Sequence, residues 1–182
     1  MSEINAFKRF YDEFRDAELN KEYYANRLST TKKKLKMLNI FLAIFAGTSA
    51  VLSFSFWSTT LLGVPIGSLS LAALTGIAVV LSIMKPYLGI ENEIERISSI
   101  QGVYSVLSSL HKDVIQKIME EMAISDSAEI CFDVMRKMRI SVDPKEDRPA
   151  DKKLVQNAQD TINKRYPQEY FWYPLSATEQ KK

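Results

Sequence analysis

No charged side chain occurs between Lys36 and Lys85, and the uncharged stretch Met37–Met84 spans 48 positions. A helix needs about 20 apolar residues to cross the hydrocarbon core of a bilayer. The stretch is therefore long enough for two crossings. A helical hairpin buried in a soluble core is the alternative interpretation. However, a soluble helix normally keeps a polar face, and neither half of this stretch has a charged one.

A break near the middle divides the stretch into two predicted helices. Gly63 and Pro65 favour the break, because glycine relaxes backbone sterics and proline lacks a backbone donor. The pattern predicts a transmembrane hairpin with helices at about 38–57 and 67–84, joined by a short turn at 58–66.

Amphipathic helices are predicted on both sides of the hairpin. Residues 3–36 carry apolar or small side chains at steps of three and four, with a gap at Lys21, and this spacing is helical. A long helix with the same spacing follows the hairpin at about 89–123. Two shorter helices are predicted after it, at about 127–140 and 149–165.

The helix at 127–140 is expected to bury Ile130, Val134 and Met138, which share one helical face. Together the patterns predict an all-α protein, in which a two-helix transmembrane hairpin is combined with long amphipathic cytosolic helices that form a helical bundle. The predicted segments are an N-terminal amphipathic cytosolic helix at 1–36, the transmembrane hairpin at 37–85 and a cytosolic helical region with an aromatic tail at 86–182.

The net charge of +2 is uninformative, but every charge lies in residues 1–36 or 85–182. Positively charged flanks stay on the cytoplasmic side of a membrane. This distribution predicts a multi-pass membrane protein with both termini cytoplasmic. Lysines beside the hairpin are also expected to contact anionic lipid, so membrane lipid is an expected partner. These topogenic lysines are Lys32, Lys33, Lys34, Lys36 and Lys85.

Small and hydroxyl-bearing residues recur within the two predicted crossings. Small residues four apart let helix backbones approach closely in lipid, and the candidate packing residues are Ala43, Gly47, Ala72 and Gly76. Hydroxyl groups on one helix face could line a water path only if several copies assemble, because two helices cannot enclose a pore. The candidate pore-lining residues are Ser68, Thr75, Ser82, Ser49 and Ser53. Alternatively, these hydroxyls bond to their own backbone or to the neighbouring helix.

Residues suited to catalysis or metal binding are scarce. His111 is the only histidine, and Cys131 is the only cysteine and is expected to be a buried thiol. No glycine precedes a Gly-Lys-Ser/Thr phosphate loop. The sequence therefore predicts that the protein is not an enzyme, with no catalytic or cofactor-binding residues, no metal site and no cofactor. No nucleic-acid partner is expected, since no basic groove with interleaved aromatic residues occurs.

The C-terminal tail is densely aromatic and is framed by Pro167 and Pro174. The tail is expected to dock on the helical core or at lipid headgroups. It could instead bind a partner, because exposed aromatic residues are typical interface anchors. The candidate interface residues are Tyr170, Phe171, Trp172 and Tyr173.

The order of these elements resembles the SLATT family, the SMODS/SLOG-associating two-transmembrane effector domains of bacterial defence systems. The resemblance covers roughly Tyr23–Ile162, with Tyr24-Ala25-Asn26-Arg27-Leu28 before the hairpin and Ile90–Met122 after it. The family is defined by its pattern and has no catalytic motif. The resemblance implies an effector in the bacterial inner membrane that opens pores during phage infection. A separate sensor or nucleotide-signalling protein would supply the trigger.

Three hypotheses follow. The first is a membrane effector of an anti-phage, abortive-infection type system that forms a homo-oligomer and opens a pore or disrupts the inner membrane. The alternative is a non-pore two-transmembrane anchor or scaffold that recruits a cytosolic partner through its helical region and aromatic tail. The third is a subunit of a larger transporter, or an assembly factor.

Overall fold

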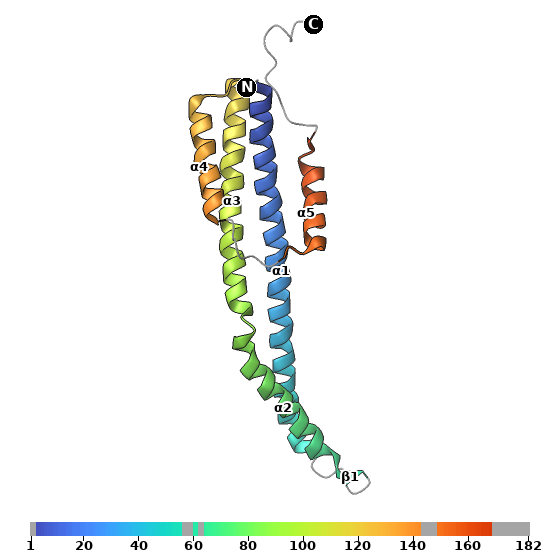
Figure 1. Cartoon of the computed structure of the whole chain (residues 1–182). Helices are drawn as coiled ribbons and strands as arrows, with labels where there is room; N and C mark the ends of the chain where they lie inside the picture. The colour runs from blue at the N-terminus through green and yellow to red at the C-terminus, as the bar shows by residue number, and fades with distance from the viewer. Residues whose placement is uncertain (1–2, 56–59, 62–63, 143–148, 169–182) are drawn as a thin grey trace. The chain divides into compact units, whose positions relative to one another are not determined.

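The computed structural model describes residues 3–55, 60–61, 64–142 and 149–168, and helices make up almost all of these residues. Side chains are described at these positions except 3–5, 46, 48–55, 60–61, 64–72 and 74. The elements are α1 (Glu3–Ser55), β1 (Thr60–Leu61), β2 (Val64–Pro65), α2 (Ile66–Tyr87), α3 (Ile90–Glu121), α4 (Asp126–Val142) and α5 (Lys152–Arg165) (Figure 1). The predicted all-α class is therefore confirmed.

The chain forms two compact units whose limits fall within helices. The arm unit is Leu28–Arg96, and the bundle unit comprises the residues up to Arg27 and from Ile97 onward. α1 and α3 each have residues in both units. The limits of the units therefore differ from those of the segments predicted from the sequence, which are 1–36, 37–85 and 86–182. α1 continues without a break from the charged residues into the uncharged stretch.

Aromatic and aliphatic side chains from four helices form the core of the bundle unit. α4 lies beside α3, and α5 lies along α1 on the side away from α4 (Figure 1). The predicted stripes on the first and third helices supply most of the core, because residues three and four apart share a face. The buried apolar residues include Phe7, Phe10, Phe14, Ala17, Tyr24, Ile97, Ile100, Tyr104, Leu107, Ile118, Phe132, Met135, Ala158 and Ile162.

The buried face of α4 differs from the expected one. Phe132 is buried and its ring centroid lies 4.4 Å from that of Phe10 on α1. The prediction that α4 buries Ile130, Val134 and Met138 is wrong, since they are 65%, 51% and 36% exposed. We call the exposed apolar residues of this helix, Ile130, Val134, Met138 and Ile140, the outer α4 face.

The helix ends follow local rules. Asp151 caps α5, since its carboxylate accepts hydrogen bonds from the backbone N–H groups of Lys153 (2.9 Å) and Leu154 (3.3 Å). This satisfies two of the donors that a helix start leaves unpaired. Between α2 and α3, Gly89 has a φ of +59°, a conformation that glycine adopts without the strain imposed by a Cβ atom.

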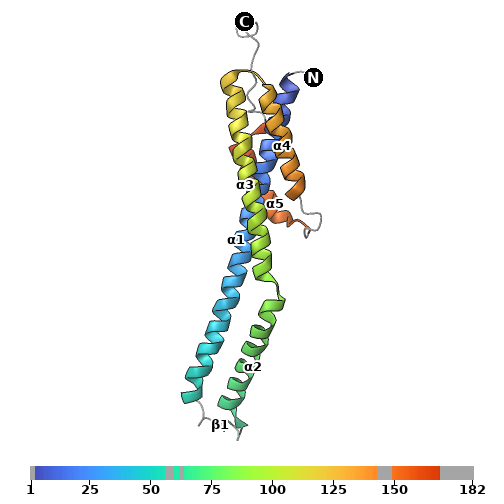
Figure 2. The same ribbon diagram turned by 90° about the vertical axis from the view of Figure 1, so that its left-hand side faces the viewer.

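The arm unit is a helical hairpin. α1 and α2 run alongside each other, and the short antiparallel pair β1–β2, with Leu61 opposite Val64, joins them (Figure 2). The described part of the turn agrees with the predicted break, and α2 begins at Ile66.

The expected membrane crossings are not found. In the part of the chain that the structure describes, no helix has both the length and the apolar composition needed to cross a bilayer. This finding contradicts the predicted location, a multi-pass protein of the bacterial inner membrane with both termini cytoplasmic.

Candidate functional site

Large apolar side chains of the arm unit are exposed on both of its long helices. They occupy neighbouring turns of α1 and a broad face of α2. Isolated exposed apolar residues are common, but a contiguous exposed group of this kind usually marks an interaction surface. This apolar arm surface consists of Met37, Ile40, Phe41, Ile44, Ile77, Val79, Val80, Ile83 and Met84.

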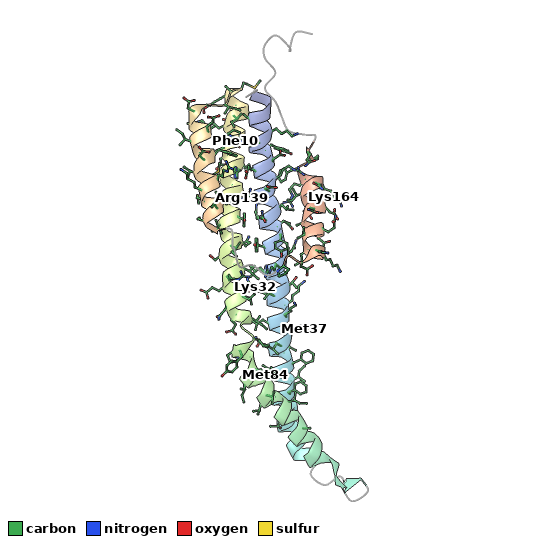
Figure 3. The ribbon with its side chains drawn as sticks, in the orientation of Figure 1. Phe10, Lys32, Met37, Met84, Arg139 and Lys164 are labelled. Carbon is green, nitrogen blue, oxygen red and sulfur yellow. The ribbon has the colours of Figure 1, made fainter. Side chains whose placement is uncertain are left out.

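Lysines border the apolar arm surface at one end. On α1 they directly precede Met37. Figure 3 shows Lys32 and Met37 on this helix, with Met84 on α2 nearby. On α2, Lys85 follows Met84 and its Nζ lies 3.4 Å from a carboxylate oxygen of Glu91. The exposed lysines of this border, which we call the lysine collar, are Lys32, Lys33, Lys34 and Lys36.

The candidate pore-lining residues fall on both helices of the arm. Thr75 and Ser82 are exposed on α2, and their spacing of seven places them on one face. Ser68 lies in α2, and Ser49 and Ser53 lie in α1, but their side chains are outside the described residues. A role in lining a water path stays a prediction.

The candidate packing residues are exposed where the structure describes them, namely at Ala43, Gly47 and Gly76. A Cβ atom added at Gly47 or Gly76 would meet nothing within 4 Å beyond its own helix. Close helix packing at these positions stays a prediction. The side chain of Ala72, and the tail residues Tyr170, Phe171, Trp172 and Tyr173, lie outside the described residues.

The bundle unit contains a buried carboxylate that sequence reasoning missed. Glu18 of α1 is only 5% exposed, and it accepts hydrogen bonds from Ser108 of α3 and, at 3.0 Å, from Lys21. Arg165 of α5 lies 3.9 Å from its second oxygen. Burial raises the pKa of Glu18, but the hydrogen bonds from Ser108 and Lys21, with the charges of Lys21 and Arg165, outweigh that effect and lower it. In the sequence, the interruption of the apolar stripe at Lys21 was the feature that indicated a polar group on this face of α1.

A second polar group joins α4 to α1. Arg139 Nη1 lies 2.6 Å from a carboxylate oxygen of Glu13 and 3.6 Å from one of Asp16. His111 of α3 is buried nearby, with its ring centroid 6.0 Å from that of Phe132. Burial lowers the pKa of His111, although the charge of Glu13 acts in the other direction.

Polar contacts also hold α5 against α1. Arg15 donates from Nε to the carbonyl oxygen of Tyr166 at 2.8 Å and from Nη2 to Oδ1 of Asn163 at 2.7 Å. Tyr11 donates to the carbonyl oxygen of Pro167 at 3.0 Å. Within the described residues, no buried side-chain nitrogen or oxygen is without a hydrogen-bond partner. These polar groups therefore serve the packing of the bundle.

The cysteine and the metal-ligating side chains that the structure describes do not provide a second candidate site. Cys131 is exposed on α4, so the expectation of a buried thiol is wrong. Among the side chains that the structure describes, no three of the metal-ligating types come close enough to hold an ion. The apolar arm surface, with its lysine collar, is an exposed apolar feature that the fold of the single chain does not explain.

Comparisons with protein-family models, with curated proteins and with solved structures find no match. The resemblance to the SLATT family therefore stays a prediction that rests on the layout of the sequence.

Proposed function

We propose that this protein is a non-enzymatic effector that binds lipid through its arm unit and disturbs the bilayer it contacts. The apolar arm surface provides contact with acyl chains, and the lysine collar provides contact with anionic headgroups. The single observation that carries the proposal is the exposure of apolar side chains on both α1 and α2 directly beside exposed lysines. The proposal requires no helix of the described chain to cross the bilayer.

The relative sizes of the two contributions indicate their roles. Removing one large apolar side chain from water is worth about 1.5–3 kcal/mol when burial is complete. One lysine near an anionic surface is worth about 1 kcal/mol. Since the apolar arm surface has more members than the collar, apolar burial supplies most of the affinity. The collar then favours anionic lipid and sets which end of the arm faces the headgroups.

The SLATT resemblance supports the effector part of the proposal. In that setting the protein acts in antiviral defence, several copies act together on one membrane, and a separate partner supplies the trigger. The bundle unit, with its satisfied polar contacts, then serves as the rigid body that carries the arm. The candidate pore-lining residues Ser68, Thr75, Ser82, Ser49 and Ser53 belong to this hypothesis as positions that copies would bring together.

A vesicle flotation experiment with the full chain tests the proposal. Val80 of the apolar arm surface and Val106 of α3 in the bundle unit form a matched pair, since they are 54% and 52% exposed. Placing a carboxylate in hydrocarbon costs roughly 2.5–3.5 kcal/mol at full depth. We therefore expect Val80→Glu to reduce the vesicle-bound fraction at least tenfold, whereas Val106→Glu floats like the unaltered protein.

Dye release from the same vesicles tests whether binding disturbs the bilayer. We expect release with the unaltered protein and with Val106→Glu, and little release with Val80→Glu. Equal flotation of all three proteins would show that the apolar arm surface is not the lipid contact. Flotation without dye release would remove the effector part and leave a lipid-binding anchor.

A further inference from the structure

The outer α4 face is a second exposed apolar surface, and it lies in the bundle unit. α4 packs into the bundle through Phe132 and its neighbours on one side. On the other side, the exposed residues Ile130, Val134 and Met138 are four positions apart, which is about one helical turn. A row of residues four apart is a ridge that fits the grooves of another helix. α4 is thus apolar on two faces, and the fold covers one of them.

The charges of α4 are separated by sign along the helix. The first half, Asp126–Asp133, has three carboxylates and no lysine or arginine, and the second half, Val134–Val142, has three cations and no carboxylate. The charged residues are Asp126, Glu129, Asp133, Arg136, Lys137 and Arg139. Arg139 forms the ion pair with Glu13 described above, and the other five are exposed.

Interaction with the helix dipole does not account for this separation by itself. The dipole favours acidic residues in the first turn and basic residues in the last, and its effect falls off beyond those turns. Asp133, Arg136 and Lys137 lie in the middle of α4. Their arrangement instead suits a second helix that runs in the opposite direction.

We propose that the outer α4 face binds the same face of a second copy of this chain, with the two helices antiparallel. A twofold axis near Val134 sets Ile130 of one copy close to Met138 of the other, so each copy uses the same residues. The acidic half of each α4 then faces the basic half of its partner. A parallel arrangement would instead bring the two acidic halves to one end of the pair and the two basic halves to the other.

The size of the surface determines the strength of this contact. α4 has 17 residues, which corresponds to about 25 Å at 1.5 Å per residue. One face of such a helix is smaller than the roughly 800 Å² per partner of a standard interface. The pair is therefore weak in dilute solution and forms where copies are concentrated. The inference rests on the proposed function only for its purpose, which is to bring copies together.

Charge reversal in the full chain tests the pairing, with co-purification of differently tagged copies in the absence of lipid as the measurement. Asp133→Lys gives positions 133 and 137 two positive charges, and Lys137→Asp gives the same two positions two negative charges. We expect each variant to recover its own kind about tenfold less than the unaltered protein recovers itself. A mixture of the two variants should restore recovery, because each supplies the charge that the other has lost.

Lys112→Asp and Asp113→Lys on α3 are the matched controls, since both residues are exposed in the same unit. They should change nothing, and association through the arm unit is the same in every variant. Val134→Glu should abolish the recovery that depends on α4. Undiminished self-recovery of Asp133→Lys and Lys137→Asp, or a mixture no better than either alone, would overturn the pairing. Because no lipid is present, such a result leaves lipid binding by the arm unit unaffected.

Discussion

Ser108 of α3 donates a hydrogen bond to the carboxylate of Glu18 on α1, and both side chains are buried. Two residues 90 positions apart in the sequence are thereby joined by a hydrogen bond to a negative charge in the core of the bundle unit. A buried carboxylate is unfavourable unless it is paired and hydrogen-bonded. The contact therefore fixes which faces of α1 and α3 meet.

Ser108→Ala should destabilise the bundle unit by about 1.5–3 kcal/mol, because it removes a hydrogen bond to a charged, buried group. Urea unfolding followed by near-ultraviolet circular dichroism measures this change, since the stacked tyrosines Tyr24 and Tyr104, with ring centroids 5.7 Å apart, lie in the bundle unit. Ser109→Ala, at an exposed position of the same helix, is the control and should change stability little. Equal effects of the two substitutions would contradict a structural role for the contact.

Stability should fall in two steps as the pH is lowered. The pKa of His111 is lowered by burial below its ordinary value of 6.5, so below pH 6.5 the unfolded state binds a proton that the folded state does not. The pKa of Glu18 is lowered from 4.5, so its contribution is lost only as the pH falls below 4.5. In both cases the unfolded state binds more protons, which makes stability rise with pH.

Unfolding curves that start at pH 7 and extend well below pH 4.5 distinguish the two groups. His111→Gln should flatten the decline that begins near pH 6.5 and leave the acid step in place. Glu18→Gln should remove the step below pH 4.5. A profile of His111→Gln parallel to that of the unaltered protein would show that the histidine does not titrate differently in the two states.

Arg139→Met should lower the free energy of local unfolding of α4 by roughly 1 kcal/mol. Its ion pair with Glu13 is partly exposed, with side-chain exposures of 33% and 24%. The effect should therefore fall between the small value of a surface pair and that of a buried hydrogen-bonded charge. Arg136→Met on the same helix is the control, because Arg136 is exposed. Hydrogen exchange of the α4 backbone amides measures the difference, and equal protection in both variants would contradict it.

Local patterns were sufficient for the helices, whereas contacts between distant segments decided the details. The helical spacing of apolar residues in 3–36 predicted an apolar stripe on the first helix, and Phe10, Phe14 and Tyr24 of this stripe are buried. α4 could not be assigned in this way, because it has apolar residues at helical spacing on two faces. Phe132 is buried rather than Ile130 since Phe10 and His111, on two other helices, meet its ring.

The periodicity of the sequence could not predict which charged groups lie in the core. The position of Glu18 depends on Ser108 and Arg165, which are far along the chain, so only the gap at Lys21 hinted at it. The uncharged stretch correctly predicted two helices and a break near Pro65. Length alone did not show how its side chains are distributed between exposed and covered positions. The roles of the site residues on the arm stay predictions, because they depend on partners outside the single chain.

Replacing the four residues of the lysine collar with glutamine should weaken binding to anionic vesicles more than to neutral ones. Each lysine near an anionic surface contributes about 1 kcal/mol, and this part of the affinity is screened by salt. The collar variant should therefore lose most of the preference for anionic lipid and most of the salt dependence. Its binding to neutral vesicles should remain, because the apolar arm surface is unchanged.

Four exposed lysines of the bundle unit, Lys112, Lys117, Lys152 and Lys153, provide a control of equal charge. Their replacement with glutamine removes the same net charge, but from the bundle unit instead of the arm unit. If the preference for anionic vesicles fell equally in both variants, net charge and not the collar would direct the protein to lipid. A loss confined to the collar variant would show that the lysines act through their place next to Met37, where headgroups and acyl chains meet the arm together.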